Sequence, residues 1–238
     1  MELHRITGWL DRTLNVAAFD DVSNNGIQVS RRGKDVRRVA FAVDASARAV
    51  AVAADAGAEL LVVHHGISWG GGIRRIDGGV YNVVKEAIDA DIALYACHLP
   101  LDAHPRLGNN AQIARLLGLS GVRPAFSYHG NVIGCVGTCR RSRKATIGGC
   151  EISLRRGEKV GVCSGGAGEF AEEAGRLGCS LFVTGEANWG ETVAAENCRM
   201  RMACCGHYET EVFGVRAVAK AMGRALGIKT TDLTEDLS

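Results

Sequence analysis

Short apolar runs of strand length alternate with amphipathic runs of helix length over the first half of this 238-residue chain. Strands and helices that alternate in this way form βαβ units, in which largely parallel strands are covered by helices. The alternating segments, in chain order, are RRVAFAVD, ASARAVAVAADAG, ELLVVHH, VYNVVKEAIDA, IALYACH and NNAQIARLLGL. The sequence therefore predicts an α/β fold with mostly parallel sheets flanked by helices.

The alternation breaks around residues 122–126, and the chain then changes character. Shorter strand-like pieces, separated by glycine and basic residues, follow over residues 131–162. The β/α alternation then resumes and ends in a helix expected from about Glu209 to Leu226. We therefore expect two linked α/β domains, the first over residues 1–126 and the second over residues 127–238.

Charge and cysteine content limit the classes of function. Lys and Arg (28) nearly balance Asp and Glu (26), and aromatic residues make up 5%, so neither a basic stripe nor stacking platforms for nucleic acid are expected. The nine cysteines include no C-x-x-C pair and do not form the framework of a small secreted domain. No apolar run approaches the ~18 residues of a membrane span. We expect a cytoplasmic protein that binds neither membranes nor nucleic acid.

Ionisable side chains follow the apolar runs instead of lying inside the helices. A single histidine at the end of a strand is more often a hydrogen-bonding boundary residue than a metal ligand. In open α/β sheets, however, ligands bind outside the carboxyl ends of the strands, so several such residues should converge there. The residues in question are Asp44, His64, His65, His98, Glu186 and His207.

The adjacent histidines His64 and His65 suggest two metal ions. Neighbouring residues of a strand point to opposite faces, so the pair cannot easily chelate one ion. It can serve two adjacent ions, or one ion and a supporting role. Asp102 lies in a polar loop that enters a helix, as suits a ligand carboxylate, whereas His104 next to Pro105 is interpreted as a bystander.

His207 and Glu211 are four residues apart, which places them on one face of a helix at chelating distance. An acidic residue in a first turn is equally explained by compensation of the helix dipole. With His64, His65 and Asp102, the pair makes a set of nitrogen and oxygen donors that suits zinc, manganese, iron or nickel better than calcium. A carboxylate such as Glu211 or Asp102 that bridges two ions is typical of bimetallic hydrolases.

The glycine-rich stretch SGGAGEF, residues 164–170, follows a strand and leads into a helix. The free N–H groups of such a turn can hold a phosphate. The stretch lacks the G-K-[ST] of a P-loop and does not match G-x-G-x-x-G, so we interpret it as a tight strand-to-helix turn. No G-x-S-x-G elbow is present, and covalent hydrolase chemistry is not supported.

Six stretches in a consistent order, from about residue 24 to residue 222, carry a resemblance to one family. They are NNGIQV, the His64-His65 pair, CHLPLDAHPRLGNNAQIARLLGL, VGVCSGGAGEF, LFVTGE and GHYETEVFGVRAVAKAM. In these stretches the chain resembles the Nif-three-like dinuclear metal-centre proteins, which are often named GTP cyclohydrolase I type 2 homologues.

The resemblance implies a set of metal ligands that agrees with the set reached from strand ends and spacing. It also implies two divalent metal ions per chain, the Nif-three-like fold of two linked α/β domains in its short form, and a toroidal homohexamer built as a trimer of dimers. The implied ligands are His64, His65, Asp102, His207 and Glu211.

Two departures from the family pattern concern the surroundings of the ligands. Gly66-Ile67-Ser68 precede Trp69 where family members commonly carry Pro and bulky apolar residues. Asn188 and Trp189 stand where some members have a histidine. The five ligands are intact, so the departures bear on the shape of the substrate pocket and on any shared catalytic acid.

The main hypothesis is a metal-dependent hydrolase that acts on a small phosphate-bearing or heterocyclic molecule, such as a nucleotide. His98 and Glu186 are candidates for orienting ligands or transferring protons, because both end strands at the same crevice. Structural hydrogen bonding explains both residues equally well. A second hypothesis is a non-enzymatic protein that stores, delivers or senses a divalent ion, or a ring that serves as a scaffold.

Overall fold

The computed structural model describes residues 1–238, and its contacts divide the chain into two compact units. Unit 1 comprises Met1–Leu101 and Val215–Ser238, and unit 2 comprises Asp102–Gly214. The domain boundary expected between residues 126 and 127 lies inside unit 2, within strand β5 (Leu119–Tyr128). Unit 1 is discontinuous because the C-terminal strand pairs with a strand from the first half of the chain. Local sequence patterns do not predict a pairing between strands so far apart in the chain.

Unit 1 contains a five-stranded sheet in the order β1-β4-β3-β2-β12. Strands β12, β2, β3 and β4 are parallel, and β1 is antiparallel to β4. The predicted α/β fold, with mostly parallel strands flanked by helices, is confirmed. The five strands are β1 (Gly26–Val29), β2 (Arg38–Asp44), β3 (Leu60–His65), β4 (Ala93–Ala96) and β12 (Lys229–Asp232).

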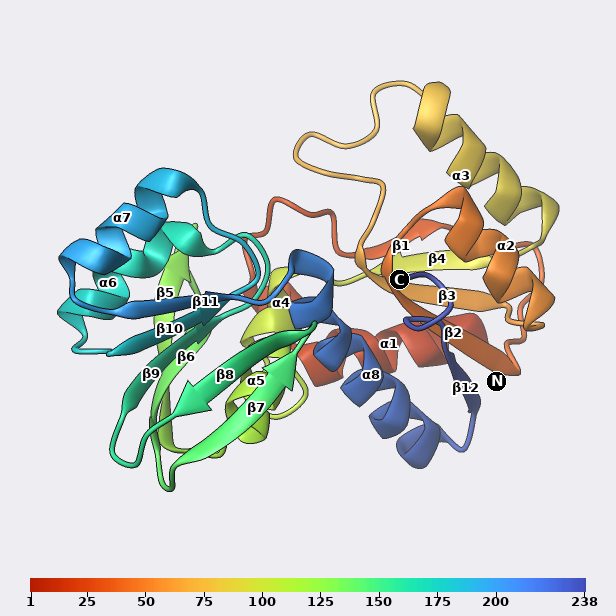
Figure 1. The fold of residues 1–238 in the computed structure, drawn as a ribbon. Helices are drawn as coiled ribbons and strands as arrows, with labels where there is room; N and C mark the ends of the chain where they lie inside the picture. Colours follow the sequence, from red (N-terminus) through yellow and green to blue (C-terminus); the bar gives the residue numbers. More distant parts are fainter. The chain divides into compact units, whose positions relative to one another are not determined.

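Helices cover both faces of this sheet (Figure 1). Helices α2 (Ala47–Asp55) and α3 (Gly78–Asp89) pack on one face through small apolar side chains. Helix α1 (Leu3–Leu14) covers the other face, where the Tyr95 hydroxyl donates a hydrogen bond to the Asp11 carboxylate at 2.6 Å. Since helices cover both faces of the sheet, the residues on both sides of β2 and β3 are apolar. Alternate strand residues face opposite sides, so these strands are continuous hydrophobic runs in the sequence.

Unit 2 contains a second five-stranded sheet, in the order β11-β10-β9-β6-β5, and a separate hairpin of β7 and β8. Strands β9, β10 and β11 are parallel, whereas β6 is antiparallel to β9 and β5 is antiparallel to β6. The remaining strands are β6 (Asn131–Cys139), β7 (Arg143–Ile147), β8 (Cys150–Leu154), β9 (Lys159–Cys163), β10 (Leu181–Thr184) and β11 (Arg201–Cys204).

The helices of unit 2 also lie on two faces of its sheet. Helix α5 (Asn109–Leu116) packs against β6, β9 and β10 through Ile113 and Ala114. On the opposite face Phe126 contacts Phe170 and Phe182, with ring centroids 5.6 and 5.3 Å apart. The short elements beyond this aromatic contact are the 3-10 turn η2 (Gly168–Phe170), α6 (Ala171–Arg176) and α7 (Trp189–Asn197).

The two points of division fall in or beside helices. Helix α4 (Leu99–Ala103) contains the first, and α8 (His207–Leu226) contains the second. The last helix thus begins two residues before the expected Glu209, so His207 is its first residue and Glu211 lies one turn later. None of the helices meets the length and hydropathy of a membrane-spanning segment.

The return of the C-terminal segment to unit 1 can be tested at Leu233. This side chain is 1% exposed and belongs to the apolar core under α2 and α3. We expect Leu233→Ala to lower the free energy of unfolding by about 2–5 kcal/mol in urea denaturation. The control Leu177→Ala, at a position that is 36% exposed, should cost less than about 1 kcal/mol. Equal costs for the two variants would contradict the assignment of the segment to the core.

Candidate metal centre

Three histidines converge at the carboxyl ends of the strands of unit 1. His64 and His65 end β3, and His98 follows β4. One ring nitrogen from each lies within 4.8 Å of the others, a spacing at which they can hold a metal ion. His64 is fully buried, and the other two are partly buried. We call these three residues the histidine cluster.

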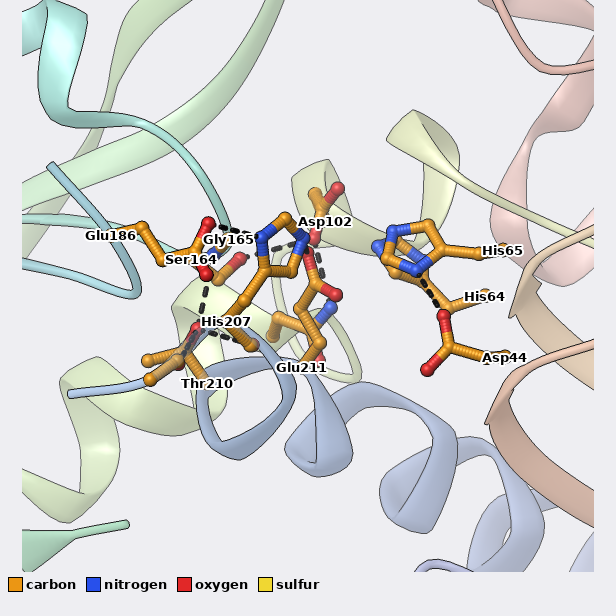
Figure 2. Close-up of polar contacts among 12 residues, drawn as sticks. Asp44, His64, His65, Asp102, Ser164, Gly165, Glu186, His207, Thr210 and Glu211 are labelled. Atoms are coloured by element: carbon orange, nitrogen blue, oxygen red, sulfur yellow. Dashed lines mark hydrogen bonds and ion pairs between the residues drawn. The ribbon is translucent and has the colours of Figure 1, made fainter. Parts of the chain in front are cut away.

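Each imidazole of the histidine cluster has its Nδ1 against an oxygen that can only accept. In the neutral form of each imidazole, Nδ1 therefore carries the hydrogen and donates it, and the lone pair lies on Nε2. Histidines that bind metals are oriented in this way by a carboxylate or a carbonyl group. The pairs are His64 with the Cys97 carbonyl at 3.0 Å, His65 with Asp44 Oδ1 at 2.8 Å, and His98 with Asp21 Oδ1 at 2.9 Å (Figure 2 shows the second).

The register of the sheet explains why Asp44 reaches His65. The two residues are direct partners at the ends of the parallel strands β2 and β3. Asp21 reaches His98 from a loop 77 positions earlier in the chain, and nothing in its local sequence pattern predicted the contact. Asp21 is therefore a residue of the site that the sequence analysis missed.

Asp21 is a fully engaged carboxylate. It accepts hydrogen bonds from the backbone N–H groups of Ser23 and Leu99 and from the Asn25 amide, in addition to His98. Burial alone would raise its pKa, but the hydrogen bond and charge of His98, with the donors of Ser23 and Asn25, lower the pKa to about 2. The carboxylate stays ionised and holds the His98 ring.

A second group of ionisable residues lies in unit 2, which we call the carboxylate cluster: Asp102, Glu186, His207 and Glu211. His207 Nε2 is 3.3 Å from Glu211 Oε1, and His207 Nδ1 is 3.0 Å from Glu186 Oε2 (Figure 2). The hydrogen bond and the charge of Glu211, followed by those of Glu186, raise the pKa of His207 to about 9. The imidazole thus holds a proton beside two carboxylates, where a divalent cation competes with that proton.

Asp102 is buried near the end of α4 and is held by two donors. Its Oδ1 accepts from the Asn109 amide at 2.8 Å and from the Ser164 hydroxyl at 3.1 Å. Asn109 is itself fixed, because its Oδ1 accepts from the backbone N–H of Gly214 in α8 at 2.6 Å. Asn109 and Ser164 orient a predicted ligand, and the sequence analysis assigned neither of them this role.

The SGGAGEF turn lies against the first turn of α8. Gly165 has φ +67°, and a Cβ atom there would stand 2.4 Å from Glu211 Oε1 and 3.3 Å from His207 Nε2. Its N–H donates to Thr210 Oγ1 at 3.0 Å, which ties the turn to the helix. Only glycine combines this backbone conformation with so close an approach. The turn therefore positions the carboxylate cluster.

The predicted site residues are thus distributed over the two clusters. The histidine cluster contains three of them, and the carboxylate cluster contains the other four. His104 lies outside both, because its Nδ1 accepts from the backbone N–H groups of Arg106 and Leu107 in a local turn. Imidazole nitrogens and carboxylate oxygens are the donors that suit a first-row divalent metal. The chain therefore has a possible metal site of His and Glu residues.

Comparisons with known proteins agree over nearly the whole chain. A family model for Duf34/NIF3 (NGG1p interacting factor 3) matches residues 1–235. A protein of Deinococcus radiodurans named GTP cyclohydrolase 1 type 2 homolog is 42% identical, over 92% of this chain and 88% of its own length. A Pyrococcus horikoshii protein of the same name is 38% identical, over 97% and 96%. The solved structure of protein ybgI, described as of unknown function, is 29% identical with a TM-score of 0.85 over 98% of both chains.

Gly165→Ala tests the close approach of the turn to α8. The methyl group would meet Glu211 and the backbone would be held at an unfavourable φ, so we expect a loss of stability well above the ~1–2 kcal/mol that the conformation alone costs. Gly178→Ala is the matched control, because Gly178 has φ +76° and nothing within 4 Å of an added Cβ. Urea denaturation of both variants gives the comparison. Equal losses would show that the contact with Glu211 has no energetic weight.

The lowered pKa of Asp21 predicts a pH dependence of stability. Its folded pKa of about 2 lies below the ordinary value of 3.8, so the unfolded chain binds more protons in acid. The stabilisation is present above pH ~5, amounts to at most about 2 kcal/mol, and is lost as the pH falls toward 2. The excess stability of the wild type over Asp21→Asn should therefore shrink between pH 5 and pH 2. Asp55→Asn, at an exposed position of α2, should differ from wild type by less than about 0.5 kcal/mol.

Proposed function

Because this chain belongs to the Duf34/NIF3 family, we propose that it is a dinuclear metal-binding protein that hydrolyses a small nucleotide-like or phosphate-bearing substrate. The name of its relatives in Deinococcus radiodurans and Pyrococcus horikoshii, GTP cyclohydrolase 1 type 2 homolog, supports a nucleotide-like substrate. The proposed ions are two divalent metals per chain, drawn from zinc, iron, manganese and nickel. The same family resemblance leads us to propose a cytoplasmic homohexamer, a toroidal trimer of dimers.

The observation that carries the proposal is the orientation of the imidazoles. Every histidine of the two clusters has its Nδ1 against an oxygen acceptor, three of them carboxylates. Each of these bonds leaves Nε2 as the nitrogen that can bind a metal ion once it carries no proton, as a ligand histidine requires. The proposed ligands come from both clusters: His64, His65, Asp102, His207 and Glu211.

Divalent ions held by these residues would supply Lewis acidity toward a phosphoryl or carbonyl oxygen and a hydroxide nucleophile at neutral pH. The protein's own groups prepare that chemistry. Glu186 holds the His207 ring through Nδ1 and so acts as a positioning residue. His98, held by Asp21, keeps Nε2 as the atom at which it can accept a proton beside His64 and His65.

Metal content per chain tests the centre directly. We expect elemental analysis to find about two equivalents in wild type purified without added metal, and a loss of at least one equivalent in both His65→Ala and Glu211→Ala. His104→Ala is the matched control, because His104 stands two residues from a proposed ligand and its Nδ1 accepts from the backbone N–H groups of Arg106 and Leu107 in a local turn. Its metal content should equal that of wild type.

Turnover then separates the two classes of function. The metal-loaded protein should hydrolyse members of a panel of nucleotides and phosphoesters. Removal of the metal with a chelator should abolish this turnover, and addition of the metal should restore it. Stoichiometric metal without turnover of any member would favour the alternative, a protein that stores, delivers or senses the ion. A wild type that contains no metal and takes up none would overturn the dinuclear centre itself.

A further inference from the structure

An indole ring lies directly beside the histidine cluster. Trp69 stands four residues after the end of β3, and its ring centroid is 5.1 Å from that of His98 and 6.0 Å from that of His65. The ring meets His98 nearly edge to face, at an interplanar angle of 77°. Trp69 is nevertheless 38% exposed, although His64 in the same cluster is fully buried. The protein thus keeps accessible aromatic surface next to its candidate ligands.

The indole is fixed in place by its own loop. The indole Nε1–H donates to the Gly66 carbonyl at 2.9 Å, and the backbone carbonyl of Trp69 accepts from the N–H of Gly72 at 3.0 Å. The next residue, Gly70, donates its N–H to the Val22 carbonyl at 2.6 Å, and Trp69 itself forms an antiparallel bridge with Ser23. The ring has its own hydrogen bond and the backbone of its loop is anchored on both sides, so the indole loses little conformational entropy when a ligand binds to it.

The NNGIQV stretch supplies the support under this loop. Gln28 Oε1 accepts from the N–H groups of Ile67 and Ser68 at 2.7 and 3.2 Å, and the Asn24 amide donates to Ser68 Oγ at 2.8 Å. A Cβ atom at Gly66 would lie 2.2 Å from Gln28 Oε1, so this contact requires glycine there. The glycine of the Gly66-Ile67-Ser68 departure from the family pattern therefore has a structural reason.

The same stretch also positions His98. Asn25 Oδ1 accepts from the backbone N–H of His98 at 2.8 Å, and Asp21, a few residues earlier, holds its ring. Residues 21–28 therefore set the placement of both the indole and the imidazole. A hydrophobic cover for the histidines would need burial of the indole, not a rigid ring that stays exposed.

We propose that Trp69 is the platform on which a planar heterocyclic ring of the substrate stacks, so that the substrate is a base-containing compound such as a nucleotide. This rests on the proposed function and names its substrate class more closely. A ring stacked on the indole would stand beside His98 and His65. The sugar and phosphate of the same nucleotide could then reach these histidines. Trp69 is a specificity-determining residue and takes no part in proton transfer.

Two sugar phosphates, one with a base and one without, test the platform. Guanosine 5′-monophosphate and ribose 5-phosphate are titrated by calorimetry into the full-length protein with its metal as purified. We expect wild type to bind the nucleotide about tenfold or more tightly than the sugar phosphate, since base stacking on an aromatic side chain supplies a difference of that order. Trp69→Leu should abolish the difference and leave ribose 5-phosphate binding unchanged.

Two further variants make the comparison specific. Trp69→Phe keeps an aromatic ring and should retain most of the preference for the nucleotide, which also guards against a folding defect in the Leu variant. Trp189→Leu removes another exposed indole, 80% exposed at the start of α7, and should behave like wild type.

The outcomes separate this inference from the proposed function. An unchanged preference in Trp69→Leu, equal binding of both probes by wild type, or binding of neither by metal-loaded wild type would overturn the platform. Elemental analysis of the same samples reports on the metal centre independently. A loss of metal in Trp69→Leu, with affinities for both probes falling together, would show that the indole only shields the histidines.

Discussion

Four imidazoles of this protein are oriented by hydrogen bonds from Nδ1 to oxygen, and the chemistry proposed for it depends on those bonds. A neutral imidazole has one donor and one acceptor, so the oxygen that receives the Nδ1–H decides that Nε2 presents the lone pair, which in His207 requires loss of the Nε2 proton beside Glu211. The oxygens come from the ends of strands and from adjoining loops, which the sheets hold rigidly. His65 and Asp44 show the simplest case, because strand register alone makes them neighbours.

The carboxylate cluster depends on close packing at the beginning of α8. His207 lies beside Glu186 and Glu211. Gly165 brings the backbone of the SGGAGEF turn against His207 and Glu211 of the helix. Burying a carboxylate such as Glu211, which is 3% exposed, costs free energy unless a cation or a donor compensates. Protonated His207 supplies that compensation within the chain, and a divalent metal would supply more of it.

Residues 21–28 link the proposed metal site to the proposed substrate site. Asp21 and Asn25 hold His98, while Asn24 and Gln28 hold the loop that carries Trp69. One short segment thus sets the distance between a candidate proton acceptor, His98, and a candidate stacking surface, Trp69. Substitutions in this segment are expected to affect both, although none of its side chains is a proposed ligand.

The sequence by itself determined the α/β class, because apolar strands and amphipathic helices are local patterns, and it determined that ionisable residues follow the strands. It also led to His64, His65, Asp102, His207 and Glu211, through strand ends, helical spacing and the family resemblance. Only the tertiary structure decided which groups orient them, since the Cys97 carbonyl lies 33 residues from His64 and the Ser164 hydroxyl lies 62 residues from Asp102. Only the tertiary structure, likewise, returned the last strand to unit 1. Such contacts depend on the register and crossing of distant segments, and no local periodicity encodes them.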